Sequence, residues 1–108
     1  MIMDDVLTLL ASEKTQDIYG VWRETLTEQE VFCRVYSVTR SEFYNAGRNG
    51  LNPEFRFEIF QGDYNGETLC EYRGKSYSIY RTYIVPGEDY IELYVERKGG
   101  SNGAKQES

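Results

Sequence analysis

Apolar and polar residues alternate along much of this chain, which is the pattern of strands with one buried face. The clearest stretch is 90–96, where Ile91, Leu93 and Val95 alternate with tyrosine and glutamate. The stretches 30–38 and 53–60 alternate in the same way, and the proline at the start of the second suits a strand end because it lacks an amide hydrogen. The pattern therefore predicts strands at all three places.

The period changes directly after the strand at 30–38. Thr39 and Glu42 stand three residues apart and fit a capping box, in which the threonine hydroxyl accepts a hydrogen bond from the N3 amide and the glutamate side chain returns to the cap amide. A short helix is expected to follow, ended by Gly47 and Gly50. Its expected buried side consists of Phe43, Ala46 and Tyr44.

Less regular strand patterns precede and follow this central region. The segment 5–12 predicts a short first strand, 13–17 is polar, and 21–25 has strand character. The pattern leaves open whether 21–38 is one long bent strand or two. Two further strands are expected at 68–72 and 75–85. In the latter, one face is expected to hold Tyr77, Ile79, Arg81 and Tyr83, and the other Ser76, Ser78, Tyr80 and Thr82.

Turn residues separate these strands. Asn65-Gly66 is a strong two-residue hairpin signal, because both positions tolerate positive φ. Arg73-Gly74 and the run 86–89 predict two more tight turns. Five to seven short strands with one helix after the strand at about 30–38 indicate an all-β fold, a small antiparallel β-barrel, since closure removes exposed edges. We expect one domain over 1–98 and a disordered tail over 99–108.

Composition excludes several kinds of chemistry. The 108 residues include no histidine, so a serine triad and a two-histidine metal site are ruled out. The net charge of −6 disfavours a general nucleic-acid binder. The carboxylate pairs Asp4-Asp5 and Glu88-Asp89 are interpreted as solvated charge. We therefore predict no catalytic, cofactor-binding or metal-binding residue, no cofactor, and no enzymatic activity.

The termini and cysteines point to the inside of a cell. No window approaches the roughly 20 apolar residues of a membrane span, and the start is acidic where a signal peptide is basic. Cys33 and Cys70 both lie within predicted strands. Two buried free thiols are expected, because intracellular disulfides are rare.

Aromatic residues gather on the last predicted strands and suggest a contact surface. Tyrosine supplies area and a hydrogen-bonding tip at low entropy cost, and tryptophan usually packs at a core edge or an interface. The alternative is a core with the phenol hydroxyls at its rim. The predicted interface aromatics are Trp22, Tyr77, Tyr80, Tyr83, Tyr90 and Tyr94.

Several segments in their order along the chain resemble a known family. They are DDVLTLL, VFCRVYSVTRSEFYNAGRNGLNPEFRFEIF, YRGKSYSIYRTYI and DYIELYVERKGG, and together they cover about Asp4 to Gly99. In this order they resemble the head closure or head-tail joining proteins of long-tailed bacteriophages, as found in prophages of Gram-positive bacteria.

The resemblance implies a role in the virion. Such proteins are small β-barrels that form a ring, usually of twelve copies, beneath the portal and adaptor of a DNA-filled capsid, and present a docking surface to the tail terminator or tail-completion protein. DNA would pass through without specific binding, no membrane would be involved, and the protein would reside at the virion head-tail interface and, during assembly, in the host cytoplasm.

The resemblance also singles out the connection 37–52, which in some family members plugs the channel. The capping box favours a packed helix over a flexible plug, and the sequence leaves both open. Arg40 and Arg48 are expected to pair with a neighbouring subunit, to touch phosphate, or to be solvated. The predicted plug or inter-subunit residues are Thr39, Arg40, Ser41, Glu42, Phe43, Tyr44 and Arg48.

Two other functions remain as alternatives to head closure. One is a tail-completion or adaptor subunit built on a similar barrel. The other is a free-standing cytoplasmic barrel that binds a small ligand or a protein, which would be a monomer with a hydrophobic pocket.

Overall fold

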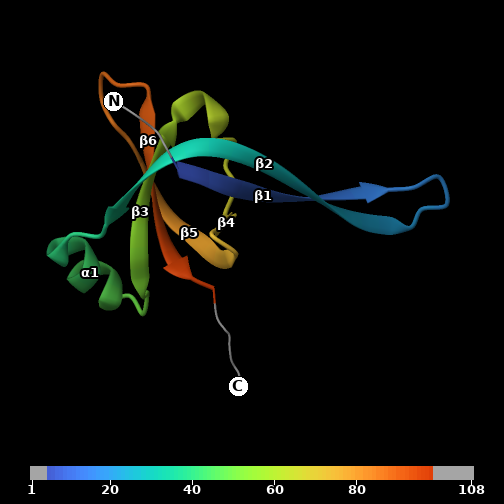
Figure 1. Cartoon of the computed structure of the whole chain (residues 1–108). Coiled ribbons are helices and arrows are strands. Elements are labelled where there is room, and N and C mark those ends of the chain that lie inside the picture. Colours follow the sequence, from blue (N-terminus) through green and yellow to red (C-terminus); the bar gives the residue numbers. More distant parts are fainter. Residues whose placement is uncertain (1–4, 99–108) are drawn as a thin grey trace.

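Six antiparallel strands close into a barrel with the order β1-β2-β3-β6-β5-β4 in the computed structural model, which describes residues 5–98 (Figure 1). One short helix follows β2, as predicted. The all-β barrel expected from the sequence is thus confirmed, whereas the predicted disordered tail at 99–108 lies outside the described residues. The elements are β1 (Asp5–Gln16), β2 (Trp22–Ser37), α1 (Arg40–Gly47), β3 (Pro53–Phe60), a 3₁₀ turn (Gln61–Asp63), β4 (Leu69–Tyr72), β5 (Lys75–Ile84) and β6 (Tyr90–Arg97).

Side chains from all six strands fill the barrel interior. Strand β6 behaves as its pattern predicts, with Ile91, Leu93 and Val95 buried. At the centre, the rings of Phe57 and Tyr72 pack edge to face with centroids 5.0 Å apart. The other buried members of the core are Leu7, Leu9, Val31, Cys33, Ile59, Cys70, Tyr77 and Ile79. The interior is therefore a packed apolar core.

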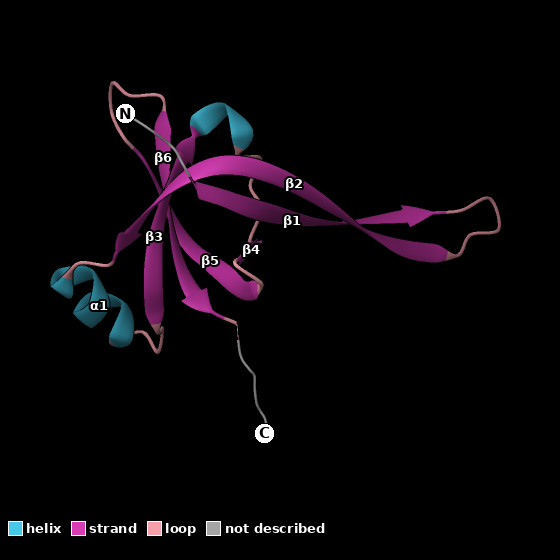
Figure 2. Ribbon diagram, in the orientation of Figure 1, coloured by secondary structure: helices cyan, strands magenta, loops and turns pink. Residues whose placement is uncertain are grey.

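Strands β1 and β2 are much longer than the barrel requires. They pair continuously from Asp5 opposite Cys33 to Gln16 opposite Trp22. The segment 13–17, expected to be a polar connection, thus belongs largely to β1, and β2 is one unbroken strand. Because β1 pairs with β4 only at residues 8–10, and β2 with β3 only at 33–37, the rest of the hairpin projects beyond the barrel (Figures 1 and 2).

The hairpin predicted at Asn65-Gly66 does not form. Strand β3 pairs with β2 and β6, whereas β4 pairs with β1 and β5. The segment between them therefore crosses to another part of the barrel, beginning with the 3₁₀ turn, and Gly66 supplies one positive φ of +87° within it. The turn at Arg73-Gly74 is confirmed: both residues have positive φ and Tyr72 pairs with Lys75.

A bulge in β5 overturns the predicted faces of that strand. Ile79 pairs with Val95, but Arg81 pairs with Tyr94, so the register shifts by one residue at Tyr80. A bulge turns the following side chains to the opposite face. Arg81 therefore lies on the outside of the barrel and not with the buried Ile79, and the prediction that they share a face is wrong.

The two cysteines form no disulfide, as predicted, and both are fully buried. Burial, and secondarily the nearby Cys33 thiol, raises the pKa of Cys70 to about 12. Since both thiols are fully buried and the reactive thiolate of Cys70 is disfavoured, neither should react with Ellman's reagent at pH 8 in the native protein. Denaturation should expose both. Rapid reaction of the native protein would contradict the packing described here.

The raised pKa of Cys70 also has a consequence for stability at alkaline pH. The folded protein holds this proton more tightly than the unfolded chain does. The contribution is therefore present below the ordinary thiol pKa of 9.0, and it is lost as pH rises from there toward about 12.

Candidate functional site

Helix α1 begins where the sequence predicts, but half of the expected capping box is absent. The Thr39 hydroxyl accepts a hydrogen bond from the Glu42 amide at 3.1 Å, which makes Thr39 the N-cap. The Glu42 side chain does not return to the Thr39 amide. It reaches instead to strand β5, more than thirty residues further along the chain.

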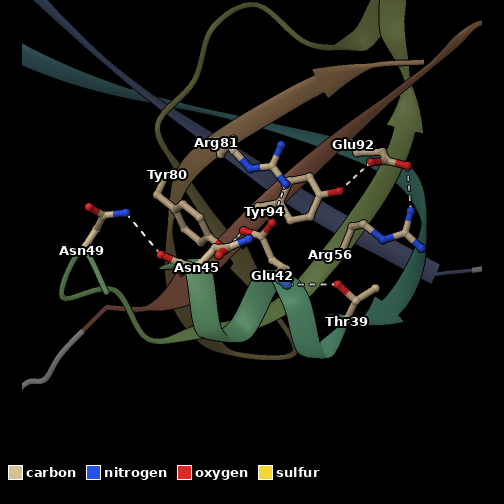
Figure 3. Close-up of polar contacts among 9 residues, drawn as sticks. All are labelled: Thr39, Glu42, Asn45, Asn49, Arg56, Tyr80, Arg81, Glu92 and Tyr94. Carbon is tan, nitrogen blue, oxygen red and sulfur yellow. Dashed lines mark hydrogen bonds and ion pairs between the residues drawn. The ribbon is translucent and has the colours of Figure 1, made fainter. Parts of the chain in front are cut away.

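The Glu42 carboxylate attaches α1 to the barrel wall (Figure 3). One oxygen accepts a hydrogen bond from the Tyr80 hydroxyl at 2.6 Å, and the other accepts one from the Arg81 guanidinium. Only 13% of the Glu42 side chain is exposed. We call Glu42, Tyr80 and Arg81 the α1 anchor.

The pKa values of the anchor follow from these contacts. Burial acts to raise the pKa of Glu42, but the hydrogen bonds from Tyr80 and Arg81 and the charge of Arg81 outweigh it, so the net pKa is lowered. Burial and the bond to Glu42 raise the pKa of Tyr80. The phenol therefore remains a donor, and the carboxylate an acceptor, at neutral pH.

A row of stacked and hydrogen-bonded side chains continues from the anchor across the outer wall (Figure 3). The Arg81 guanidinium lies 3.8 Å from the ring centroid of Tyr94, whose hydroxyl donates to Glu92 at 2.7 Å. Arg56 donates to the same Glu92 carboxylate at 2.7 Å and stacks on Tyr36 at 4.1 Å. These contacts thus connect α1 with four neighbouring strands, which are β5, β6, β3 and β2.

The α1 anchor bears on the connection 37–52, for which the sequence leaves open a packed helix or a flexible plug. Here the connection contains a helix, and Ala46 is its buried residue. The predicted burial of Phe43 and Tyr44 is wrong, since 48% and 60% of these side chains are exposed. Their neighbours in sequence, Glu42 and Ala46, contact the barrel, so the aromatic rings lie on the side that turns away from it.

The outward side of α1 is basic and aromatic. Arg40, Tyr44 and Arg48 are spaced four residues apart and share one side of the helix, with Phe43 beside them. Within residues 5–98, neither arginine forms a hydrogen bond or ion pair through its side chain. We call Arg40, Phe43, Tyr44 and Arg48 the outer α1 face. Ser41 is exposed on the same turn as Arg40.

The projecting hairpin is the second candidate surface, and the sequence did not single it out. We call it the arm; it consists of Ala11–Gln16, Trp22–Thr27 and the turn at 17–21 between them. Its tip is well defined because the Asp17 carboxylate accepts hydrogen bonds from the amides of Tyr19 and Val21 and from Arg23. Ile18 and Tyr19 extend from this turn and are 91% and 83% exposed.

The two faces of the arm differ in chemistry. One face continues the buried side of the barrel and is polar, with Glu13 opposite Thr25 and Ala11 opposite Thr27. The other, which we call the outer arm face, carries apolar residues between acidic ones on β2, and beside them on β1 lie Ser12, Lys14 and Gln16. Trp22 and Leu26, each 65% exposed, are separated by Glu24, and Glu28 follows Leu26. Such exposed apolar side chains, gathered on one face, are typical of a contact surface.

The predicted interface aromatics fall into three groups. Tyr77 is a core residue with 2% exposure and is therefore inaccessible to a partner. Tyr80 and Tyr94 are occupied by the α1 anchor and its continuation, and Tyr90 is half-buried. Trp22 and Tyr83 have the exposure that an interface requires.

Residues 5–98 hold no group of three or more cysteine, aspartate and glutamate side chains placed to bind a metal ion. In the same part of the chain, no helix has the length and apolar character needed to cross a membrane. The outer α1 face and the arm, with their exposed aromatic and apolar side chains, are the candidate functional site.

Comparison with known proteins identifies the fold. No family model matches the chain, and no curated protein matches it in sequence. The solution structure of protein SF1141 from Shigella flexneri 2a is similar, with a TM-score of 0.72 and 17% identity over 97% of this chain and 96% of that one. At this identity the likeness concerns the barrel fold.

Proposed function

We propose that this chain is a structural subunit of the head-tail connector of a long-tailed bacteriophage. In this proposal it forms a ring beneath the portal or adaptor, closes the DNA-filled capsid and provides the surface on which the tail docks. The observation that carries the proposal is the arm. It adds nothing to the barrel core, yet it displays Ile18, Tyr19, Trp22 and Leu26 to solvent, as expected of an assembly subunit.

The barrel interior supports an assembly role over a free-standing ligand carrier. Leu7, Phe57, Ile59, Leu93 and Val95 are all 0% exposed and point into the barrel from three of its strands. Barrels that carry a small ligand keep an internal cavity for it, whereas this interior is filled by side chains. Contacts with partners are therefore expected on the outside of the protein.

The charge of the chain suits a channel for DNA. A net charge of −6 on each subunit would give a ring a strongly negative potential. Phosphate would be repelled from its wall, so DNA would slide through without being held. Helix α1, tied to the barrel by Glu42, serves in this proposal as a rigid contact element instead of a free plug.

Deletion of the gene from an inducible prophage that carries it tests the proposal. Head closure predicts tailless capsids that package DNA and then lose it, seen by electron microscopy with protected DNA assayed in parallel. Added purified protein should restore DNA retention and tail attachment. The matched control is the same prophage with the gene returned in trans.

The other outcomes of this experiment separate the remaining functions. Tailless capsids that stay full would assign the protein to tail completion and overturn head closure. Normal infectious particles would overturn both assembly functions.

A further inference from the structure

We infer that the outer arm face of one copy binds the outer α1 face of a second copy of this chain, so that successive copies join head to tail. This inference rests on the proposed ring and names the contact that would build it. It is carried by the placement, spacing, charge and exposure of the two faces.

The two faces lie at opposite ends of the molecule. The arm projects to the right in Figure 1, and α1 lies at the far left of the barrel (Figures 1 and 2). The arm therefore cannot reach the helix of its own copy. A contact between two different surfaces of identical subunits repeats from one copy to the next, and it produces a closed ring or an open filament.

The spacing of charges on the two faces matches. Along β2, Glu24, Leu26 and Glu28 lie on one face, and at 3.3 Å per residue the two glutamates are about 13 Å apart. Along α1, Arg40 and Arg48 are eight positions apart, or about 12 Å at 1.5 Å per residue. Tyr44 lies midway between the arginines as Leu26 lies midway between the glutamates. An acid-apolar-acid row thus faces a base-aromatic-base row of equal length.

These charges are available for a partner. Within residues 5–98, Arg40, Arg48 and Glu28 form no hydrogen bond or ion pair through their side chains. Glu24 accepts one hydrogen bond, from the Ser12 hydroxyl at 2.7 Å. Residues 11–27 of the arm hold three acidic and two basic residues, and Glu28 and Glu30 at its base add two more acids. This stretch therefore has a net negative charge that is attracted to a basic surface.

Apolar surface on both sides would be covered by the contact. Trp22 and Leu26 are exposed on the arm, and Phe43 and Tyr44 are exposed on α1. Beside the helix lies a shallow hollow lined by Val38, Thr39, Arg40, Phe43 and Tyr44. A two-stranded ribbon is marginally stable by itself, and no third strand among the described residues pairs with the arm. Covering its apolar face would stabilise it.

Cysteine cross-linking between purified copies tests the contact directly. Protein carrying Leu26→Cys is mixed with protein carrying Tyr44→Cys and oxidised under mild conditions. The native thiols do not interfere, because both are buried. The control mixes Thr25→Cys with Tyr44→Cys, since Thr25 is exposed on the opposite face of the arm. A heterodimer yield several-fold above that of the control is expected, and equal yields would overturn the inference.

Charge reversal makes the test specific. Glu24→Arg with Glu28→Arg on the arm partner, or Arg40→Glu with Arg48→Glu on the helix partner, should each reduce the cross-linked yield several-fold. Combining the two reversed partners should restore it, and added salt should lower the yield of the unreversed pair. If the combined reversal fails to restore the yield, the proposed pairing of charges is wrong.

The cross-linking result is independent of the phage experiment. Cross-linking between purified copies with normal virions from the deleted prophage would overturn the proposed function and leave this contact standing. Leaking capsids without specific cross-linking would support head closure and overturn this contact.

Discussion

Replacing Phe57 by alanine is expected to lower the free energy of unfolding by about 3 to 5 kcal/mol. The side chain is 0% exposed, and its ring lies 5.0 Å from that of Tyr72 and 6.5 Å from that of Tyr77, centroid to centroid. Truncation would remove these edge-to-face contacts and leave a cavity that strands on a closed barrel cannot collapse to fill. Since domains of this size have a total stability of about 5 to 15 kcal/mol, the variant would be near unfolding. Urea denaturation followed by fluorescence measures the difference.

Phe32→Ala provides the matched control for this substitution. Phe32 lies on the neighbouring strand but points outward and is 67% exposed. Its truncation should change the free energy of unfolding by no more than about 0.5 kcal/mol. If Phe57→Ala and Phe32→Ala had equal effects, the inward direction assigned to Phe57 would be wrong.

Replacing Glu42 by alanine is expected to release α1 from the barrel and to cost about 2 kcal/mol. The substitution removes the acceptor of the Tyr80 hydroxyl and the partner of Arg81. The Tyr80 hydroxyl, half-buried under the helix, would be left without its acceptor. The N-cap would persist, because Thr39 bonds the backbone amide of residue 42 and not its side chain. Hydrogen exchange should therefore increase at the α1 amides more than in the strands of the barrel.

Two further variants separate the anchor from a general loss of charge. Glu88→Ala removes an exposed glutamate from the turn between β5 and β6 and should leave both stability and α1 exchange unchanged. Glu42→Gln keeps an acceptor for Tyr80 but loses the ion pair, so its effect should be smaller than that of alanine. Equal α1 exchange in Glu42→Ala and wild type would show that Glu42 does not hold the helix.

The lowered pKa of Glu42 predicts the pH dependence of the anchor. The folded state binds this proton less tightly than the unfolded chain, whose glutamate has the ordinary pKa of 4.5. The stabilisation is therefore fully present above that pKa and is lost as pH falls through the lower folded value. The stability difference between wild type and Glu42→Gln should shrink over the same interval and vanish below it.

Local signals in the sequence predicted the elements that depend on near neighbours. The strand at 90–96 was recognisable because burial of one face imposes a period of two on its residues. The start of α1 was recognisable because Thr39 and the amide that it caps are three residues apart. The turn at Arg73-Gly74 followed from the positive φ that the second residue readily adopts.

The arm was missed because its strands have no buried face. The sequence predicted strand at 21–25 and left open whether 21–38 is one strand or two. Every residue from Val21 to Glu30 is exposed, so no buried face marks the continuity of this half of β2. Two signals were present: a turn centred on Asp17 and Gly20, and the acid-apolar alternation from Trp22 to Glu28. Neither signal reveals how far the ladder between β1 and β2 extends beyond the barrel. Pairing with β1 holds the segment in strand conformation.

The candidate site was predicted in part. The sequence singled out Thr39 to Arg48 as a functional segment, but it assigned Phe43 and Tyr44 to the buried side. The structure assigns the barrel side to Glu42 and Ala46 instead, because Tyr80 and Arg81 offer the carboxylate two donors. Those donors stand 38 and 39 residues away in the chain, and the bulge at Tyr80 is needed to bring both to the outer wall.

The sequence by itself therefore determined the all-β class, most strands, the position of the helix and the absence of histidine chemistry, since these depend on composition and on contacts within a few residues. The tertiary structure alone decided the order of strands around the barrel, the face of α1 that turns outward and the projection of the arm. These features depend on pairing between distant segments, and such pairing is selected by the closure of the whole barrel and not by any local pattern.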